Sequence, residues 1–163
     1  MTALLTGTSY LNHIVKLTDL ETLDLSSVRH YTIGGVKPPS EVFLKFKDIF
    51  PNGNLCEMYG MSELSAFMSI SYPESREGSA GRLVDGIRVK IIGEDGNKCG
   101  INEPGVVHLK YVRKLLGYYR NPQANAEAFD EDGWFVTGDV GYLDEDGFFF
   151  YQDRKSEIIR YNG

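Results

Sequence analysis

The stretch Gly133-Trp134-Phe135-Val136-Thr137-Gly138-Asp139-Val140-Gly141-Tyr142-Leu143 is the part of the chain from which the fold is most readily inferred. Trp134-Phe135 is typical of a short apolar strand. Thr137-Gly138 is expected to end that strand, because glycine lets the backbone turn or approach a ligand closely. The sequence therefore predicts Asp139 at the tip of a turn, with a second strand starting behind it.

A hairpin is expected directly after this stretch. Residues 144–147 read Asp-Glu-Asp-Gly, and Asp-Gly supplies the positive φ of a tight turn. Residues 148–151 form the returning strand, which ends near Asp153-Arg154. The carboxylate of Asp139 and the guanidinium of Arg154 would then share one face, where they would suit the diol and phosphate oxygens of a nucleotide. The same pattern also fits a β-meander with a surface ion pair.

The composition is that of a globular protein of 163 residues, long enough for one compact domain or two small lobes. The formal net charge is −6 and there is no basic run, which argues against a nucleic-acid partner. No apolar segment approaches the roughly 20 residues that span a bilayer, and no signal peptide is recognised. We therefore expect no transmembrane segment.

The cysteines and histidines carry no metal-binding motif. Cys56 and Cys99 are the only cysteines, and their wide spacing fits a reducing compartment without excluding one disulfide bond. The three histidines, His13, His30 and His108, are scattered, so each is interpreted as structural.

The first half of the chain alternates helical and strand patterns. An apolar stripe at helical spacing predicts a helix within residues 2–17. A strand is predicted over residues 28–33, ending at Gly34-Gly35, and a helix from about residue 38 to residue 50, opened by prolines that a first turn tolerates. The next strand covers residues 55–59. This β-α-β order predicts parallel strands in a larger α/β sheet.

The character of the sequence changes near Tyr72-Pro73. Strand alternation follows over residues 87–91 and 106–111, and Asn121-Pro122 predicts a short helix that ends by residue 129. Short strands with frequent turns are typical of a small barrel or distorted sandwich. The predicted class is therefore α/β: residues 1–75 form part of a doubly wound sheet, residues 76–153 a small β-rich (distorted barrel) subdomain, and residues 154–163 a hinge.

Two further motifs follow predicted strands, where parallel α/β sheets collect ligands. Gly34-Gly35 would let a flat base lie against the backbone, although Gly-Gly is also an ordinary turn. Residues 59–63 read Tyr-Gly-Met-Ser-Glu, which combines a ring for stacking, a hydroxyl for a phosphate oxygen and a carboxylate for Mg²⁺. Taken singly, this motif also fits a strand, a turn and a helix capped by Ser62.

Taken together, these motifs resemble one family. Residues 33–35, 58–63, 133–139 and 153–163 occur in the order and spacing of the adenylate-forming enzymes. Within that superfamily the chain is most similar to the acyl-CoA synthetases, the coumarate–CoA ligases and the beetle luciferases. Shorter pieces agree, namely Gly81-Arg82-Leu83, Pro104-Gly105, Gly117-Tyr118-Tyr119 and Asn121-Pro122. The resemblance covers essentially the whole chain.

The resemblance implies a two-step reaction in which a carboxylate attacks the α-phosphorus of Mg·ATP and the thiol of coenzyme A then displaces AMP. The partners would be a fatty or aryl carboxylic acid, ATP and coenzyme A. The candidate catalytic residues would be Ser62, Glu63 and Arg160, with Glu63 as the Mg²⁺ ligand. The nucleotide and coenzyme A would be bound by Gly34, Gly35, Val36, Glu57, Met58, Tyr59, Gly60, Met61, Ser62, Asp139, Arg154, Asn162 and Gly163.

The chain departs from the family pattern at four points. Met58 stands where glycine is usual and would crowd the pocket between the acyl group and the nucleotide. Ser156 replaces Lys or Asp at the hinge, and Asn162 stands where close relatives often carry Lys. The Ser/Thr/Gly-rich phosphate loop and the small C-terminal domain with its catalytic lysine are not in this sequence. We therefore expect a fragment that packs on the missing remainder of its own chain.

Three interpretations of the function remain open. The first is a fragment of an ATP-dependent carboxylate–CoA ligase that is inactive by itself. The second is a luciferase-type monooxygenase of the same superfamily, and the third is a non-catalytic remnant that binds a nucleotide or a partner. The resemblance implies an intracellular location, peroxisomal or cytoplasmic, and a role in fatty acid metabolism.

Overall fold

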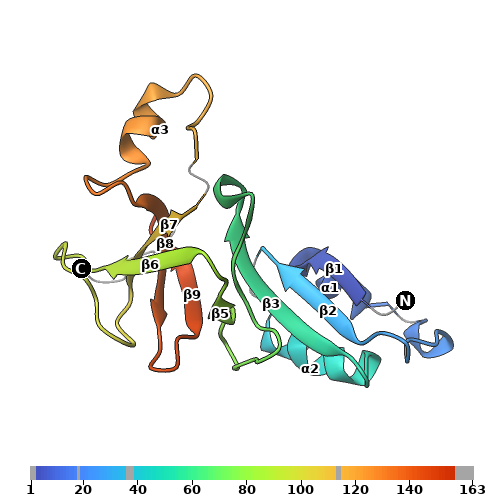
Figure 1. Cartoon of the computed structure of the whole chain (residues 1–163). Helices are drawn as coiled ribbons and strands as arrows, with labels where there is room; N and C mark the ends of the chain where they lie inside the picture. The colour runs from blue at the N-terminus through green and yellow to red at the C-terminus, as the bar shows by residue number, and fades with distance from the viewer. Residues whose placement is uncertain (1–2, 18, 36–38, 113–114, 157–163) are drawn as a thin grey trace, which may run out of the picture.

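The computed structural model describes residues 3–17, 19–35, 39–112 and 115–156. Its elements are β1 (Ala3–Gly7), α1 (Thr8–Ile14), the 3₁₀ helix η1 (Leu20–Thr22), β2 (His30–Gly34), α2 (Ser40–Ile49), β3 (Asn54–Met61), the 3₁₀ helix η2 (Ser62–Leu64), β4 (Ala66–Ile70), β5 (Arg82–Leu83), β6 (Ile87–Ile92), β7 (Gly105–Tyr111), α3 (Pro122–Glu127), β8 (Phe135–Leu143) and β9 (Phe149–Arg154). The strands form two sheets, in the orders β1-β2-β3-β4-β5 and β6-β7-β8-β9. Figure 1 shows the two sheets in neighbouring lobes, with α1 and α2 in the lobe of the first.

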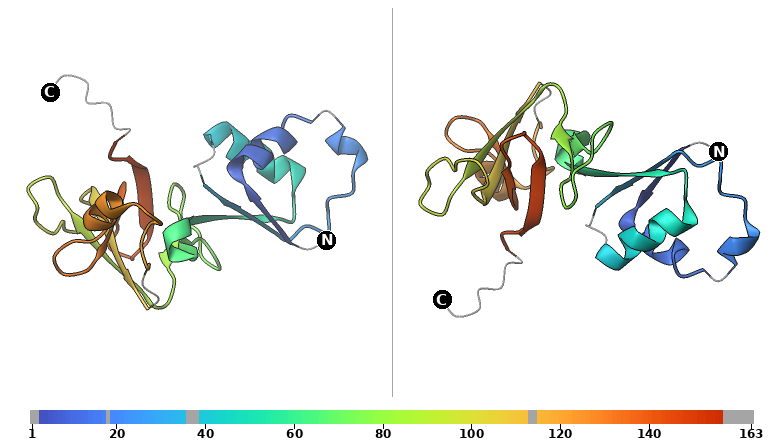
Figure 2. Two further views of the ribbon diagram at one scale, coloured as in Figure 1. Left: turned by 90° about the horizontal axis from the view of Figure 1, so that it is seen from above. Right: turned by 90° about the horizontal axis from the view of Figure 1, so that it is seen from below.

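The first sheet begins with three parallel strands, which confirms the β-α-β prediction. Side chains alternate between the two faces of these strands, and α1 and α2 cover one face, as the views in Figure 2 show. The rings of Tyr31, Phe46 and Phe50 contact one another there, with centroids 4.9 to 5.4 Å apart. The core under the helices consists of Leu11, Val28, Tyr31, Ile33, Val42, Phe46 and Phe50.

The N-terminal segment differs from the predicted helix over residues 2–17. Residues Ala3–Gly7 form strand β1, and helix α1 begins only at Thr8. β1 pairs with β2 in register from Ala3 opposite His30 to Gly7 opposite Gly34. The prediction was wrong for this strand because a short apolar run fits either element until a neighbouring strand supplies backbone hydrogen bonds.

The second sheet is antiparallel throughout and open. A closed barrel would require hydrogen bonds between β6 and β9, but these two strands are the edges of the sheet. The distorted barrel expected from the sequence is therefore corrected to an open four-stranded sheet. The predicted hairpin is confirmed, since Gly147 has a φ of 80° and its backbone N–H donates to the carbonyl of Asp144.

Strand β8 passes through Asp139 without ending, which corrects the predicted turn tip. β7 and β8 pair at Val106 with Val140 and at His108 with Val136, so four steps along β8 match two along β7. The extra residues form a bulge, and Gly138 has a φ of 74° within it. The glycine bends the strand but does not end it, because β7 and β9 both keep the backbone paired.

The two sheets share one segment of the chain. Strand β4 is hydrogen-bonded in the first sheet, yet Met68 on β4 is fully buried in the core of the second. Backbone hydrogen bonds also join Ala80 and Gly81 to Phe149. That second core consists of Leu64, Met68, Ala80, Ile91, Val107, Leu109 and Phe149. The division of the chain near residue 75 stays a prediction.

Candidate nucleotide-binding site

Five of the predicted site residues line one cavity. Gly34 ends β2 and Gly35 follows it, while Glu57, Met58 and Tyr59 lie on the adjacent strand β3. The cavity lies at the carboxyl end of β2, where parallel α/β sheets collect their ligands. Its volume is about 40 Å³, and its remaining lining residues are Thr8, Ile33, Gly78, Ala80 and Tyr151.

The Tyr-Gly-Met-Ser-Glu motif differs locally from its prediction. The predicted strand ends at Tyr59, whereas β3 continues through Met61, so Gly60 and Met61 also lie within the strand and not after it. The strand is longer because β4 pairs with it antiparallel, with an irregular register between Tyr59 and Gly60. Ser62 and Glu63 open helix η2, and Met61, not Ser62, occupies the cap position.

Asp139 lies where the two sheets meet. Its side chain is buried, and the hydroxyl of Tyr59 donates a hydrogen bond to Oδ2. On its other side, Nε of Arg154 lies 2.9 Å from Oδ1. Asp139 and Arg154 are direct cross-strand partners on β8 and β9, which confirms the expectation that the carboxylate and the guanidinium share one face.

Tyr59 connects the cavity to this carboxylate. Its ring stacks on Tyr151 with centroids 5.6 Å apart and also contacts Phe149. Burial, and then the hydrogen bond to Asp139, raises the pKa of Tyr59 well above its usual value. The hydroxyl therefore remains a hydrogen-bond donor at every physiological pH.

Glu63 is positioned by two tyrosines from the other region of the chain. The hydroxyl of Tyr118 donates to its Oε1 at 2.9 Å, and the hydroxyl of Tyr111 donates to its backbone carbonyl at 2.8 Å. Burial, and then the hydrogen bond to Glu63, raises the pKa of Tyr118. The Gly117-Tyr118-Tyr119 pattern by itself gives no role to Tyr118, because local patterns do not show a contact across 55 positions.

Four predicted site residues lie outside the described part of the chain, namely Val36, Arg160, Asn162 and Gly163. Their predicted roles therefore stay predictions. Within the described residues, no three His, Cys, Asp or Glu side chains gather as a metal-binding group. No helix in the described part of the chain is long and apolar enough to cross a membrane. Cys56 and Cys99 are both free thiols.

The fold and these motifs are those of a nucleotide-binding protein. Comparison with known proteins identifies the family. Residues 1–119 match the profile of the family described as AMP-binding enzyme. The chain therefore belongs to the AMP-binding, adenylate-forming family, as the resemblance of its motifs predicts.

Two curated relatives illustrate the similarity. Acyl-CoA synthetase 7 of Caenorhabditis elegans is 38% identical over 143 residues, which cover 88% of this chain and 26% of that protein. 4-Coumarate–CoA ligase 1 of Arabidopsis thaliana is 34% identical over 157 residues, which cover 92% of this chain and 28% of that protein. The chain thus spans little more than a quarter of the length of these relatives.

Solved structures share the fold. The luciferase-like enzyme from the nonluminescent mealworm Zophobas morio aligns with a TM-score of 0.84 and 33% identity, covering 94% of this chain and 38% of that one. The O-succinylbenzoate coenzyme A synthetase of Bacillus subtilis, solved in complex with ATP and magnesium ion, aligns with a TM-score of 0.80 and 26% identity. That alignment covers 100% of this chain and 34% of the synthetase.

Proposed function

We propose that this chain is the part of an ATP-dependent carboxylate–CoA ligase that holds the adenosine half of ATP and one Mg²⁺ ligand. The observation that carries the proposal is the buried carboxylate of Asp139, which meets Tyr59 from the first sheet and Arg154 from the second beside the cavity at Gly34-Gly35. The relatives named acyl-CoA synthetase and 4-coumarate–CoA ligase support the reaction class.

The chemistry of a ribose fits Asp139. An ionised carboxylate only accepts hydrogen bonds and has about four acceptor positions, whereas a ribose diol presents two adjacent donors. Arg154 offsets the negative charge and offers further N–H donors to ribose or phosphate oxygens. The proposal therefore assigns the ribose to Asp139, with Arg154 assisting it.

Adenine would lie against Gly34 and Gly35, where the backbone carries no side chains. The cavity that these two glycines line has a volume of about 40 Å³. Tyr59 lines the same cavity and would present its ring to the base.

The residues around Glu63 fit a magnesium ion bound together with ATP. Mg²⁺ in such sites takes one or two protein carboxylates, and substrate phosphates and water complete its shell. Tyr118 holds one oxygen of Glu63, so the side chain is already oriented for a ligand at the other. When bound, the ion offsets charge on the phosphates, while exposed Ser62 supplies a hydroxyl for a phosphate oxygen.

The finer parts of the proposal concern the rest of the enzyme. The proposed substrate is a fatty or aryl acid, and the proposed acceptor is coenzyme A. Arg160 would lie near the adenylate, and Asn162 and Gly163 would lie beside coenzyme A. The chain would pack on further segments of the same protein. An intracellular location, peroxisomal or cytoplasmic, accompanies the proposal, and two free cysteines are compatible with a reducing compartment.

Exchange of pyrophosphate into ATP tests the proposal. The full-length protein should exchange pyrophosphate in the presence of fatty or aryl acids, whereas residues 1–163 alone should not. Each lost charge-stabilising element costs about 10²–10³ in rate, and the phosphate loop and the catalytic lysine are two such elements. Full-length protein that neither exchanges pyrophosphate nor binds ATP would exclude a ligase and leave a non-catalytic remnant.

A luciferase-type monooxygenase is the second candidate, favoured by 36% identity over 146 residues to the luciferin 4-monooxygenase of Luciola mingrelica. Light emission with a luciferin, assayed beside CoA-thioester formation from a fatty acid, separates the two activities. Thioester without light supports the ligase, and light supports the monooxygenase.

A further inference from the structure

The segment that connects the two sheets also forms part of the candidate nucleotide cavity. Residues 71–81, here called the connecting segment, run from the end of β4 to the start of β5. Gly78 and Ala80 of this segment line the cavity, together with residues of β2 and β3. The position of the connecting segment therefore contributes to the width of the cavity.

Hydrogen bonds hold the connecting segment at both of its ends. At the first end, the amide of Ser71 donates to the carbonyl of Glu57 at 2.8 Å, and the hydroxyl of Ser71 accepts the amide of Glu57 at 2.6 Å. At the second end, the amide of Ala80 donates to the carbonyl of Phe149 at 2.8 Å. The two ends are therefore fixed to the first and the second sheet, and the stretch between them carries Arg76.

Arg76 joins the middle of the connecting segment to the hairpin between β8 and β9. Its guanidinium donates to the carboxylates of Asp144 and Asp146, and its central carbon lies 4.5 Å from the centroid of the Phe148 ring. Asp144 is buried, and its Oδ1 also accepts the amides of Asp146 and Phe148, at 3.1 and 2.8 Å. The carboxylate that Arg76 binds is therefore held in place by the backbone of the hairpin itself.

We propose that Arg76 is a positioning residue for the nucleotide, because its bridge to the hairpin holds Gly78 and Ala80 in place as a wall of the cavity. The inference rests on the proposed function, in which this cavity receives the adenine of ATP. Arg76 is not among the described residues that line the cavity, so it acts through the wall and not by contact with the base. Without the bridge the wall is in place for only part of the time, and the apparent affinity for ATP falls by that fraction.

Four variants of the full-length protein test this inference. Arg76→Gln removes the charge and the bridge, whereas Arg76→Lys keeps the charge but lacks the planar fork of donors. Asp146→Asn weakens only the outer half of the bridge, at a side chain that is 52% exposed. Arg88→Gln is the matched control, because Arg88 on β6 also lies over an aromatic ring, that of Trp134, but takes no part in the bridge.

Two measurements are made on each variant, calorimetric titration with ATP and the kinetics of pyrophosphate exchange. Arg76→Gln should raise the dissociation constant of ATP about three- to tenfold, the size expected for a partly exposed bridge that acts through the wall. In the exchange reaction the KM for ATP should rise while kcat stays unchanged, because the wall affects binding and not the chemical step. Arg76→Lys should recover part of the affinity, Asp146→Asn should lose less than Arg76→Gln, and Arg88→Gln should match the unchanged protein.

The outcomes separate the inference from the proposed function. ATP affinity that depends on Arg76, without exchange for any acid, supports the inference and overturns the ligase activity. Exchange with the same KM for ATP in Arg76→Gln and the unchanged protein overturns the inference and keeps the ligase. Equal losses in Arg76→Gln and Arg88→Gln, or a fall in kcat at constant KM, also overturn the inference. If Arg76→Gln does not fold, Asp146→Asn at its exposed position decides the same comparison against Arg88→Gln.

Discussion

The two sheets contribute different chemistry to the candidate site. The parallel sheet offers backbone, since β2 ends at Gly34-Gly35, and a Cβ added at Gly35 would meet nothing within 4 Å. The antiparallel sheet offers charge, since Asp139 and Arg154 face each other across β8 and β9. Parallel strands bring their carboxyl ends to one edge, whereas antiparallel neighbours bring two side chains within contact distance.

This difference shows why neither sheet is a site by itself. The bare backbone has no group that recognises a ribose, and the ion pair has no surface for a base. The Tyr59–Asp139 hydrogen bond and the packing of Met68 in the second core set the distance between the two parts. Substitutions in the core of one sheet should therefore have the largest effect. Substitutions at the contact between the sheets should have a smaller effect, and those at the periphery of the site the smallest.

The largest effect is expected in the two cores. Phe46→Ala should lower the free energy of unfolding by about 3–5 kcal/mol and Leu109→Ala by about 2–5 kcal/mol, because both side chains are buried and would leave cavities. Hydrogen exchange should show the loss of protection mainly in β1–β3 for Phe46→Ala and in β6–β9 for Leu109→Ala. Uniform loss across both sheets would mean that they unfold as one unit.

The next effect concerns the contact between the sheets. Asp139→Ala should weaken ATP binding by about 1.5–3 kcal/mol, or roughly 10- to 150-fold, because it removes a charged acceptor and leaves Arg154 without this partner. Calorimetric titration of ATP into the full-length protein measures this change. The control is Asp95→Ala, in the exposed turn between β6 and β7, where the carboxylate accepts hydrogen bonds from Asn97. An unchanged ATP affinity in Asp139→Ala would remove Asp139 from the site.

A smaller effect, dependent on pH, is expected in the segment between α3 and β8, which contacts the second sheet. Asp130 lies 2.8 Å from Nζ of Lys90 and 2.9 Å from Nδ1 of His108, and the amide of Trp134 donates to it. Partial burial by itself raises the pKa of Asp130, but the hydrogen bonds from Lys90, Trp134 and His108 outweigh it and hold the pKa well below its usual value. The stabilisation is therefore present above the unfolded-state pKa of about 3.9 and is lost as the pH falls through the folded-state pKa.

Asp130→Asn should thus cost about 1–3 kcal/mol of unfolding free energy at pH 7, and much less at pH 2. Urea unfolding at a series of pH values measures the unfolding free energy at pH 7, at pH 2 and between them. Asp132→Asn is the matched control, since Asp132 is 80% exposed and lies 3.7 Å from the same lysine. If both variants show the same pH dependence, the cluster around Asp130 is not the source of acid sensitivity.

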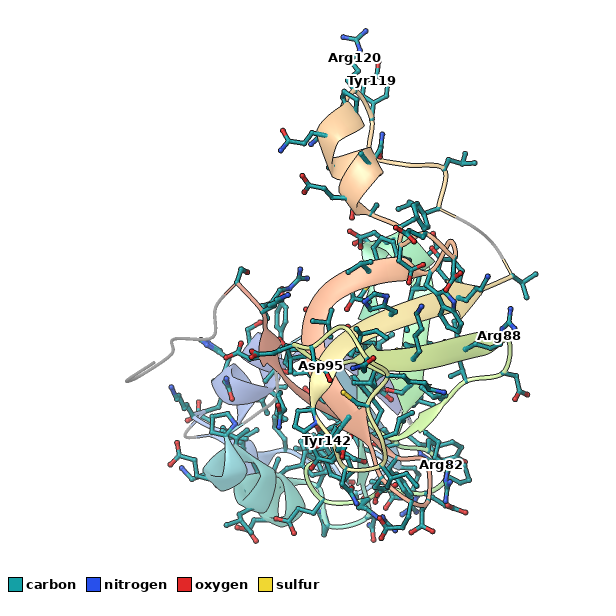
Figure 3. All side chains as sticks on the ribbon, turned by 90° about the vertical axis from the view of Figure 1, so that its left-hand side faces the viewer. Arg82, Arg88, Asp95, Tyr119, Arg120 and Tyr142 are labelled. Carbon is teal, nitrogen blue, oxygen red and sulfur yellow. The ribbon has the colours of Figure 1, made fainter. Side chains whose placement is uncertain are left out.

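The smallest effect is expected at the periphery. Tyr118→Phe removes the hydrogen bond that orients Glu63 and should weaken binding of Mg²⁺ in the presence of ATP about 2- to 10-fold, as for the loss of one ordinary hydrogen bond. Titration with Mn²⁺ followed by electron paramagnetic resonance measures this affinity without turnover. Tyr119→Phe is the control, because Tyr119 lies with Arg120 at the tip of the segment beside α3, away from both sheets (Figure 3). Equal effects of the two variants would refute a positioning role for Tyr118.

Much of the local structure was predictable from the sequence. Asn121 caps α3 through its side chain, which accepts from the amide of Ala124, and Pro122 begins the helix. Gly147 makes the predicted hairpin, and the β-α-β order makes the parallel strands. Motif order alone also identified the family to which the chain belongs. These features depend on residues within a few positions of each other or on spacing along the chain, both of which are present in the sequence.

Other features were decided only by contacts between distant segments. Ala3–Gly7 is a strand because β2 lies beside it, and Asp139 stays within β8 because it pairs with Arg154 on β9 while β7 pairs with β8 on both sides of the bulge. The hydrogen bond from Tyr59 to Asp139 spans 80 positions, and no local pattern encodes such a distance. Met58 likewise lines two cavities, one beside Gly35 and one beside Leu5, because β1, β2 and β3 meet in the folded chain. Local propensity is set by each residue and its neighbours, whereas strand pairing and side-chain packing depend on which surfaces the whole fold brings together.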